Sequence, residues 1–373
     1  MSKVDELIRE LCPDGVELVA LGQLVKFGNG KDHKPLGSGD IPVYGSGGVM
    51  RFVDRSIYDE PSVLIPRKGS LGNIFFTEEP FWVVDTVYFT TIDESKIVPK
   101  FLYFYLQGLR LQEMNQAGGV PSQTQSRLKK IPINLPPLAV QDEIVRILDQ
   151  FVELDRELEQ EIAGRTVQFN QVREDLISGA SFPRVPVGSL ATRVSTGATP
   201  KAGESRYYQD GDIPWLRTGE VNFGEVWETE KLITQAALDE TNVSWIAEHC
   251  VIVAISGATA GRVAVNKIPM TTNQHCCNMQ INPEQADYRF VFHALAASYE
   301  DLKAQGRGAR GDLNTSIIKG FKIPLPPIEV QEEIASQLDT FTEYIDNLKR
   351  ERELRQKQYE HYRDQLLDFP VKE

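Results

Sequence analysis

The sequence predicts an α+β protein in which two similar α/β blocks are separated by a pair of long antiparallel coiled-coil helices, with a pseudo-two-fold relation between the halves. Three observations predict this fold class. A segment near the middle of the chain returns near its end at a constant offset of 190 residues. Each copy contains a long proline-free run with a heptad pattern of apolar residues. Each copy also follows a larger block of short strand-like segments.

The repeated segment combines an extended lead-in with a helix. Lys129–Ser178 and Lys319–Asp368 align without a gap and share 19 identical residues. Because proline fixes φ and lacks an N–H, the Leu-Pro-Pro of each copy indicates an extended linker. The uninterrupted run after it indicates a helix. Two such copies on one chain pack most simply as an antiparallel pair.

Apolar residues recur every three or four positions along both predicted helices, as they do at a coiled-coil interface. Asp155 interrupts this pattern, and we expect it to pair with Arg355 of the other helix, the alternative being that both side chains extend into solvent. The residues expected to pack at the helix interface and against partners are Ile144, Leu148, Phe151, Leu158, Ile162, Ile334, Leu338, Phe341, Ile345 and Leu348.

The composition is that of an ordinary soluble protein. Hydrophobic residues make up 41% and charged residues 25% of 373 positions, which is enough chain for two or three domains. No stretch approaches the roughly 20 apolar residues of a membrane span. The first residues, MSKVDELIREL, indicate a charged amphipathic helix rather than a signal peptide. We therefore expect a cytoplasmic protein with no membrane association.

The net charge of −13 is concentrated on the predicted helices. Residues 1–18, 136–178 and 323–373 carry −3, −6 and −5, whereas residues 19–135 carry +2 and residues 179–322 carry −1. The nearly neutral blocks can present local basic surfaces to a nucleic acid. The acidic helices would repel a phosphate backbone and are better suited to a protein partner.

The two blocks follow one plan. Strand-like VLIP, NIFF and FWVVDTVYFTTI precede a predicted helix at Pro99–Met114, and DIPWL, VIVAISGATAGRVAV and the helical YRFVFHALAASYEDLKAQ follow in the same order in the second block. Diverged loops on a duplicated frame indicate two binding sites with different ligands. The expected boundaries are an N-terminal helical segment 1–18, a first block 19–135, a central helix 136–182, a second block 183–325 and a C-terminal helix 326–373.

No catalytic or metal-binding motif is present. Phe27–Gly30 resembles part of a nucleotide-binding glycine loop but lacks the third glycine and the acidic residue downstream, so we interpret it as a flexible loop. The sequence contains no GxxxxGK[ST], no HExxH and no Asn/Asp-Pro-Pro-aromatic motif. The cysteines have neither CxxC spacing nor a disulfide framework, which favours buried thiols; they are Cys12, Cys250, Cys276 and Cys277.

The blocks do offer loop-borne cationic and amide side chains, which can read base edges, and Gly-rich loops, which let the backbone approach phosphates. For any single residue, a solvated polar loop is the alternative. The candidates in the first block are Lys31, His33, Lys34, Ser46, Arg67, Lys68, Ser70, Asn73, Gln123, Gln125 and Arg127. Those in the second block are Lys201, Arg217, Ser256, Thr259, Arg262, Asn273, Gln274, Arg307, Arg310 and Asn314.

An N-terminal segment ending in LCPDGVE precedes two variable blocks. Each block is followed by the motif L-P-P-x-x-V-Q-x-E-I and a long helix. The motif lies at Leu135–Ile144 and at Leu325–Ile334. This arrangement resembles the specificity subunit of type I restriction-modification systems over the whole chain. The proline-glutamine motif is the specific part of the resemblance, and Asn134, where the second copy has Pro324, is a small departure. The resemblance implies that each block is a target recognition domain that reads one half of a bipartite DNA sequence.

The resemblance also implies the partners. They are double-stranded DNA, two modification (methyltransferase) subunits that carry S-adenosylmethionine, and restriction/translocase subunits that use ATP and Mg. The chain itself would be a non-catalytic recognition subunit without a cofactor. A self-standing two-headed DNA-binding regulator and a coiled-coil protein scaffold are the alternatives, and a stand-alone enzyme is the least favoured.

Overall fold

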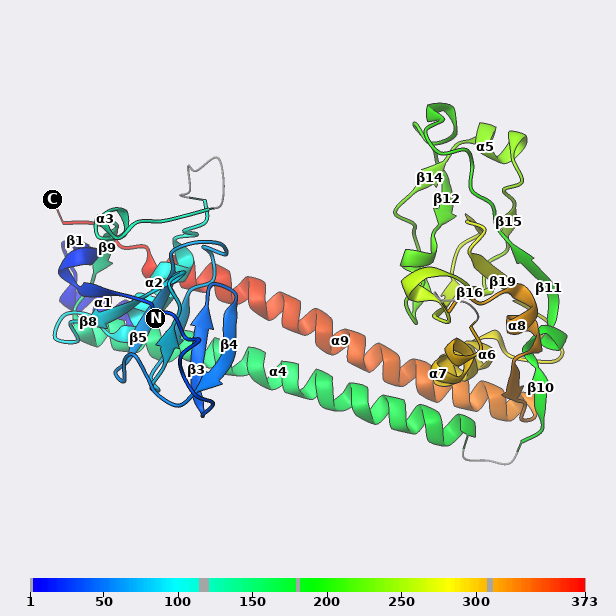
Figure 1. The fold of residues 1–373 in the computed structure, drawn as a ribbon, viewed down its shortest axis with the longest axis horizontal. Coiled ribbons are helices and arrows are strands. Elements are labelled where there is room, and N and C mark those ends of the chain that lie inside the picture. The colour runs from blue at the N-terminus through cyan, green and yellow to red at the C-terminus, as the bar shows by residue number, and fades with distance from the viewer. Residues whose placement is uncertain (1–2, 114–120, 179–181, 307–310, 373) are drawn as a thin grey trace. The chain divides into compact units, whose positions relative to one another are not determined.

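The protein divides into two compact units, each containing one block and part of both long helices. Unit 1 is Met1–Gln160 with Arg350–Glu373, and unit 2 is Glu161–Lys349. The long helices are α4 (Leu138–Ser178) and α9 (Ile328–Leu367) (Figure 1). The domain boundaries expected from the sequence separate blocks from helices and stay predictions. The computed structural model describes residues 3–113, 121–178, 182–306 and 311–372.

Unit 1 contains helices α1 (Lys3–Leu11), α2 (Pro99–Gly108) and α3 (Gln125–Leu128). Its strands are β1 (Glu17–Ala20), β2 (Val25–Asn29), β3 (Ile41–Gly45), β4 (Gly48–Val53), β5 (Ser62–Pro66), β6 (Phe75–Thr77), β7 (Trp82–Val83), β8 (Val87–Ile92) and β9 (Pro132–Leu135). A four-stranded antiparallel sheet has the order β2-β8-β5-β6. A small sheet has the order β4-β3-β7, with β3 parallel to β7, and β1 pairs with β9.

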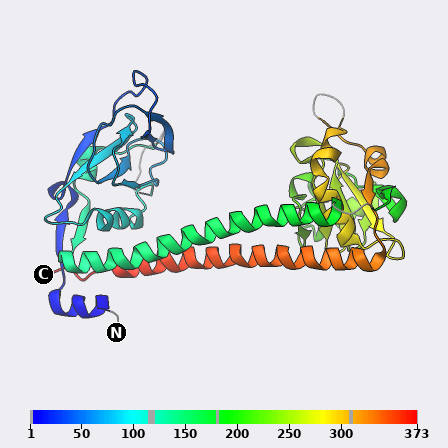
Figure 2. The same ribbon diagram turned by 90° about the horizontal axis from the view of Figure 1, so that it is seen from below.

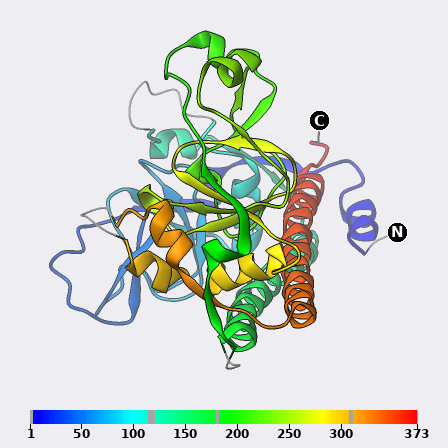
Figure 3. The same cartoon turned by 90° about the vertical axis from the view of Figure 1, so that its right-hand side faces the viewer.

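Unit 2 contains helices α5 (Gln235–Glu240), α6 (Tyr288–Ala297), α7 (Tyr299–Ala304) and α8 (Thr315–Gly320). Its strands are β10 (Arg184–Pro186), β11 (Ala191–Thr196), β12 (Ile213–Leu216), β13 (Glu225–Val226), β14 (Leu232–Ile233), β15 (Trp245–Ile246), β16 (Val251–Ala254), β17 (Val263–Asn266), β18 (Met270–Thr272), β19 (Cys276–Ile281) and β20 (Lys322–Pro324). The larger sheet has the order β11-β19-β16-β17-β13 and the small sheet β14-β12-β18-β15. Figures 1 and 3 show the small sheet and α5 on the side of unit 2 away from α9.

The two units repeat one topology, as the sequence predicted. β11-β19-β16-β17 follows the order of β2-β8-β5-β6, and β14-β12-β18 follows that of β4-β3-β7. The parallel pair of each small sheet also falls at the same place, between β3 and β7 in unit 1 and between β12 and β18 in unit 2. Unit 2 adds β13 beside β17 and β15 beside β18. The predicted pair of similar α+β blocks is therefore confirmed.

Two local expectations in unit 1 were wrong. Phe27 and Gly28 belong to strand β2, where they pair with Thr90 and Phe89, rather than to a flexible loop. A Cβ on Gly28 would lie 2.1 Å from Cζ of Phe89, so the ring of the opposite strand fills the space that a side chain would need. The helix expected to reach Met114 ends at Gly108 because Arg110 has a φ of 44°, which no right-handed helix continues.

A glutamine and an aspartate fasten each block to its long helix, and we call these two side chains the helix clamp. In unit 1, the buried Gln141 accepts a hydrogen bond from the backbone N–H of Val98 at 2.8 Å. Its amide nitrogen donates to the carbonyl oxygens of Lys96 and Pro136 at 3.0 and 2.8 Å. Eight residues further along α4, Asp149 contacts Nζ of Lys100 at 2.8 Å. The clamp thus joins the start of α4 to the start of α2.

Unit 2 builds the same clamp from the equivalent positions of the repeat. Gln331 accepts from the backbone N–H of Asp287 at 3.0 Å and donates to the carbonyl of Pro326 at 2.8 Å. Asp339 contacts Nη1 of Arg289 at 3.1 Å and Nε2 of His293 at 2.8 Å. The proline-glutamine motif therefore has a structural cause, because the glutamine satisfies the backbone of the proline linker and of the block at once.

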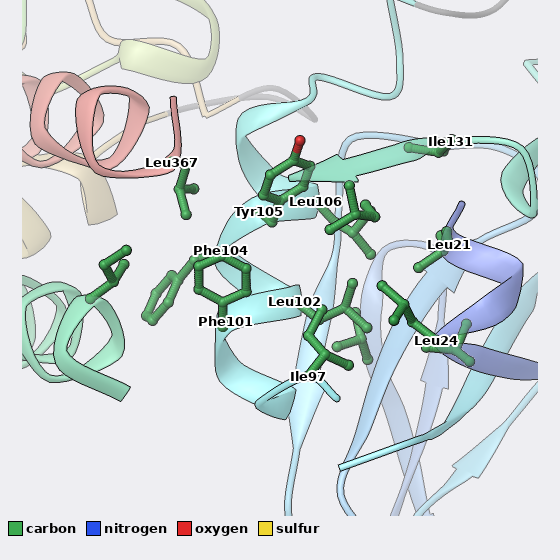
Figure 4. Packing of buried hydrophobic residues seen from close by; sticks show 14 of the residues in the cluster. Leu21, Leu24, Ile97, Phe101, Leu102, Phe104, Tyr105, Leu106, Ile131 and Leu367 are labelled. Carbon is green, nitrogen blue, oxygen red and sulfur yellow. The ribbon is translucent and has the colours of Figure 1, made fainter. Parts of the chain in front are cut away.

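The core of unit 1 lies on both sides of α2. Figure 4 shows α2 between the ends of α4 and α9 on one side and Leu21 and Leu24 on the other. Phe101 and Leu102 are fully buried in this core. In unit 2, Phe290 and Leu295 of α6 are fully buried in the corresponding cluster. Each block helix is therefore the hydrophobic link between its sheet and the long helices.

Within each unit, α4 and α9 pack antiparallel through aromatic rings at equivalent positions. In unit 1, Phe151 lies 6.3 Å from Tyr359, centroid to centroid, and in unit 2 Phe169 lies 5.6 Å from Phe341. Of the residues expected at the helix interface, Ile144, Leu148, Ile334, Leu338, Ile345 and Leu348 are buried, and Phe151, Leu158, Ile162 and Phe341 are half-buried. In the described part of the chain, no helix is both long and apolar enough to cross a membrane.

The expected pair of Asp155 with Arg355 is wrong, because Asp155 pairs with Arg352. Nε and Nη2 of Arg352 each contact a carboxylate oxygen of Asp155 at 3.0 Å. This arginine lowers the pKa of Asp155. Arg355 instead contacts Glu351 of its own helix at 3.3 Å, just as its equivalent Arg165 contacts Glu161 at 3.6 Å.

Segments near both ends of the chain belong to unit 1, and α1 lies beside the start of α4 (Figure 2). Arg146 and Lys3 contact the buried carboxylate of Glu143 at 2.6 and 2.9 Å and lower its pKa to about 2. These ion pairs contribute fully above the ordinary carboxyl pKa of 4.5 and are lost as the pH falls through about 2. Val16 pairs with Val371, which joins the N-terminal segment to the C-terminal tail.

Breaking one clamp tests its contribution to stability. We expect Gln141→Leu to lower the free energy of unfolding of unit 1 by about 1–3 kcal/mol, because it leaves the backbone groups of Val98, Lys96 and Pro136 without their partner. Urea unfolding followed by circular dichroism measures this loss. Gln150→Leu, at an exposed position of the same helix, is the matched control and should change stability by less than about 0.5 kcal/mol. Equal losses in both variants would contradict the clamp.

The contribution of the Asp155–Arg352 pair to stability can be tested by replacing it with the apolar residues found at the equivalent positions of the repeat. The positions equivalent to Asp155 and Arg352 are Ile345 and Ile162. We expect Asp155→Ile and Arg352→Ile each to destabilise by about 1 kcal/mol, since the first removes one of the two carboxylates that contact Arg352 and the second leaves the half-buried Asp155 without its cation. The double variant should recover most of the loss. Losses that add in the double variant would show that the two side chains do not interact.

Candidate nucleic-acid interface

In both units, the loop that follows the first strand of the larger sheet begins at a glycine that packs closely against the backbone of another segment. A Cβ on Gly30 would lie 1.9 Å from the carbonyl oxygen of Val84, and a Cβ on Gly197 would lie 1.8 Å from that of Thr272, so only glycine allows this approach. The next residues accept a hydrogen bond from an indole N–H at 3.0 Å, Lys31 from Trp82 and Ala198 from Trp215. The loops with Lys31, His33 and Lys34 and with Lys201 begin here.

The candidate residues of unit 1 gather where β5 ends and β8 begins. The backbone N–H of Arg67 donates to the carbonyl of Thr86 at 2.8 Å, and its guanidinium carbon lies 5.8 Å from the centroid of the Tyr88 ring. This cation–π contact holds the guanidinium near the sheet edge. Asn29, paired with Tyr88 in the sheet, accepts a hydrogen bond from Nε2 of Gln125 at 3.1 Å.

A second set of contacts brings the turn between β3 and β4 to the same place. Nδ2 of Asn73 donates to the carbonyl of Ser46 at 3.1 Å. Lys68 forms a bridge with Ser122, in the segment that leads to Gln125. Lys68 and Ser70 are exposed. We define the unit 1 surface as the six candidate residues joined in this way, Ser46, Arg67, Lys68, Ser70, Asn73 and Gln125.

The remaining candidates of the first block are outside this definition of the surface. Gln123 is buried and donates to the carbonyl of Leu111 at 3.0 Å, so its amide holds a turn. Lys34 is exposed, with its backbone N–H bound to the Asp32 carboxylate at 3.1 Å. His33 and Arg127 are half-buried.

Three candidates of unit 2, Ser256, Asn273 and Gln274, lie on neighbouring segments. Oε1 of Gln274 accepts a hydrogen bond from the hydroxyl of Thr199, and its amide nitrogen lies 3.1 Å from Nε2 of His275. The neighbouring Asn273 is buried and accepts from the backbone N–H of His275 at 3.0 Å. Ser256 follows Ile255, whose N–H donates to the carbonyl of His275 at 2.9 Å. Of these three candidates Gln274 is exposed, as are its neighbours Thr199 and His275.

A second part of unit 2 lies between β16 and β17. Arg262 donates from its backbone N–H to the carbonyl of Thr259 at 2.9 Å and from Nη1 to the side-chain oxygen of Asn222 at 2.9 Å.

Asn314 caps α8, because its side-chain oxygen accepts from the backbone N–H of Ile317 at 2.9 Å. Asn314 therefore has a structural role whether or not it contacts a ligand.

The remaining candidates of the second block are Arg217, Lys201, Arg307 and Arg310. Arg217 contacts the carboxylates of Glu220 and Glu230, so its charge is neutralised within the chain. Lys201 is exposed in the loop after Gly197. Arg307 and Arg310, which the sequence offered as candidate DNA contacts, lie outside the described residues.

Sequence reasoning missed the residues that hold these side chains in place. Asn29 and Tyr88 position Gln125 and Arg67, and Thr199 and Asn222 position Gln274 and Arg262. The available signal was adjacency to a glycine that ends a strand, since Asn29 precedes Gly30 and Thr199 lies two residues after Gly197. Pairing across the sheet could not be read from the sequence because it depends on the ladder register.

The described part of the chain offers no cluster of side chains that could hold a metal ion. No group of three His, Cys, Asp or Glu side chains converges there on a possible metal position. The four cysteines are free and buried, as the sequence indicated. Burial raises the pKa of Cys250 to about 11 and that of Cys276 to about 12, so these thiols stay protonated and unreactive near neutral pH.

Comparison with known proteins places this geometry in a family. The family model described as "Type I restriction modification DNA specificity domain" matches residues 13–163 and again residues 185–356. The chain is 30% identical over 301 residues to the type I restriction enzyme EcoR124I/EcoR124II specificity subunit of Escherichia coli, covering 76% of this chain and 74% of the relative. It is 27% identical over 358 residues to a putative type I restriction enzyme specificity subunit of Haemophilus influenzae, covering 89% of each.

Solved structures show the same fold at low identity. The S subunit of a type I restriction-modification system from M. genitalium superposes with a TM-score of 0.61 at 13% identity, covering 94% of this chain and 95% of that chain. A chain from a study of complex assembly and conformational transition of a type I restriction-modification system gives 0.63 at 14% identity and covers 95% and 97%.

Proposed function

The chain belongs to the family of type I restriction-modification specificity subunits, and we propose that it gives such a complex its DNA sequence specificity by reading a bipartite target, one half with each unit. One observation carries this proposal. The backbone frame of the two candidate surfaces is the same, whereas the side chains on it differ.

Two backbone hydrogen bonds of this frame repeat in both units. Arg67 donates to Thr86 at 2.8 Å and accepts from the N–H of Gln123 at 2.9 Å. At the equivalent place in unit 2, Ile255 donates to His275 at 2.9 Å and accepts from the N–H of Leu313 at 2.8 Å. A cation in unit 1 thus stands where unit 2 has an aliphatic side chain. Such a substitution on a fixed frame changes which base edges a surface can pair with.

The two surfaces offer different chemistry to double-stranded DNA. The unit 1 surface presents Arg67 and Lys68, which pair with guanine acceptors or phosphates, beside the amides of Asn73 and Gln125. Unit 2 presents the exposed amide of Gln274, a group that suits adenine. We infer that the two half-sites differ in sequence. The polar loop residues of both surfaces that stay exposed are the proposed contacts.

We infer that the catalytic steps take place in partner subunits. Modification subunits would carry S-adenosylmethionine and the methyl-transfer site, and restriction/translocase subunits would use ATP and Mg. The acidic long helices, with −6 and −5 net charge in residues 136–178 and 323–373, are the proposed docking surface for two modification subunits. This chain would be a non-catalytic, cofactor-free cytoplasmic recognition subunit.

Methylation mapping tests the proposal. The chain is co-expressed with the modification subunit of its own system, and methylated positions in the host DNA are mapped. We expect a bipartite motif, and exchange of residues 183–325 for those of a relative should change one half of that motif and leave the other unchanged.

A full-length chain with conservative surface changes far from both candidate surfaces serves as the control. Loss or change of both halves after the exchange would contradict independent reading. A complex that forms without any methylated motif would favour a protein scaffold, and specific DNA binding by the chain without a modification subunit would favour a self-standing regulator.

A further inference from the structure

The exposed amide of Gln274 is held at both of its ends. In the turn between β18 and β19, its Oε1 accepts a hydrogen bond from the hydroxyl of Thr199, and its Nε2 lies 3.1 Å from Nε2 of His275. We call these three exposed side chains the amide lock. A glutamine that is held in advance loses less conformational entropy on binding than one that rotates freely, so the lock prepares this amide for a ligand.

The two residues that hold the amide are themselves fixed through the backbone. The N–H of His275 donates to Oδ1 of Asn273 at 3.0 Å, and its carbonyl accepts from the N–H of Ile255 at 2.9 Å. The carbonyl groups of the residues before and after Thr199 both accept hydrogen bonds from aromatic side chains, at 3.0 and 2.6 Å. The lock is therefore attached to two well-anchored segments.

The histidine determines the direction of the amide. A threonine hydroxyl can donate or accept, so Thr199 is compatible with either direction. The 3.1 Å contact with His275 is a hydrogen bond when the ring carries its proton on Nδ1, because Nε2 then accepts from the amide nitrogen. This leaves Thr199 to donate to Oε1. The amide of Gln274 thus has its nitrogen toward His275 and its oxygen toward Thr199.

The amide lock belongs to what differs between the units. Matching backbone hydrogen bonds define equivalent positions, between residues 67 and 86 and residues 255 and 275, and between residues 31 and 83 and residues 198 and 272. The residues of unit 1 at the positions of Thr199, Gln274 and His275 are Asp32, Asp85 and Thr86. Two carboxylates and a hydroxyl cannot form this network. A network that is built from diverged side chains on a shared frame indicates specificity rather than a role in the fold.

We propose that the amide lock reads an adenine in the second half-site, with Gln274 contacting the base edge and His275 acting as the positioning residue that orders its amide. The proposal rests on the proposed function. After its internal hydrogen bonds, the amide still has one N–H to donate and one oxygen lone pair to offer. Adenine presents an acceptor, N7, beside a donor, the N6 amino group, on its major-groove edge, whereas guanine presents two acceptors there. The ordered amide therefore suits adenine in one direction only.

Two base analogues test this contact atom by atom. 7-Deazaadenine lacks the N7 acceptor, and 2-aminopurine lacks the amino group on the major-groove edge. The complex of the full chain with its modification subunit is bound to its mapped target, with each adenine of the second half-site replaced in turn. At one position, we expect each analogue to weaken wild-type binding roughly five- to tenfold, the size of one lost hydrogen bond. Gln274→Ala should bind the unmodified duplex more weakly and no longer distinguish it from the analogues.

Replacements of His275 separate ordering of the amide from mere packing. His275→Gln keeps an acceptor at a similar reach and should retain the discrimination, whereas His275→Ala should lose part of it. His275→Lys has only donors and draws Oε1 toward itself, so it should abolish the discrimination even though its charge favours DNA binding in general. Gln280→Ala, at another exposed glutamine near the end of β19, is the control and should match the wild type. Thermal unfolding checks that each variant folds.

Wild-type binding that is insensitive to both analogues at every adenine of the second half-site would overturn the inference, as would a second half-site without an A·T pair. In that case, weaker binding of Gln274→Ala to every duplex would assign the amide to a phosphate instead. Undiminished discrimination by His275→Lys would remove His275 as the positioning residue. Analogues in the first half-site should act equally on the wild type and all variants. Absence of any bipartite target would instead refute the proposed function itself.

Discussion

The buried glutamine at the start of each long helix is the contact on which both units depend. Gln141 and Gln331 each use both ends of one amide, accepting from the block and donating to the proline linker. Each backbone group would otherwise be left without a partner in the interior, which is costly. The aspartate eight residues later, Asp149 or Asp339, contacts the block helix α2 or α6. The two contacts together fix both the position and the rotation of the block on its long helix.

The repeat preserves this frame and varies what is attached to it. The clamp residues, the sheet order and the glycines at the first strand ends are shared by both units. Side chains on the candidate surfaces differ, and so does one helix contact, in which the Asp155–Arg352 pair of unit 1 has isoleucines as its counterparts. A polar pair at one place in an otherwise repeated helix interface favours a single register over its alternatives.

The sequence was most informative where a periodic pattern or a duplication constrains structure. The heptads and the ungapped repeat predicted the long helices and the paired blocks, because 3.6-residue periodicity and proline positions are local signals. The register between two helices depends on contacts between residues that are distant in the sequence. The sequence therefore predicted Arg355 rather than Arg352 as the partner of Asp155. The same limit applies to the surface, where burial of Gln123 and neutralisation of Arg217 depend on partners distant in the chain.

The most direct test of this account is to loosen one clamp and measure discrimination at each half-site separately. The complex containing Gln331→Leu is assayed below its unfolding transition, with the ratio of binding to the cognate duplex and to duplexes carrying single base changes as the readout. The account predicts that the ratio falls for the half-site read by unit 2 and stays unchanged for the other, with the opposite pattern for Gln141→Leu. Equal loss at both half-sites, or none at either, would contradict it.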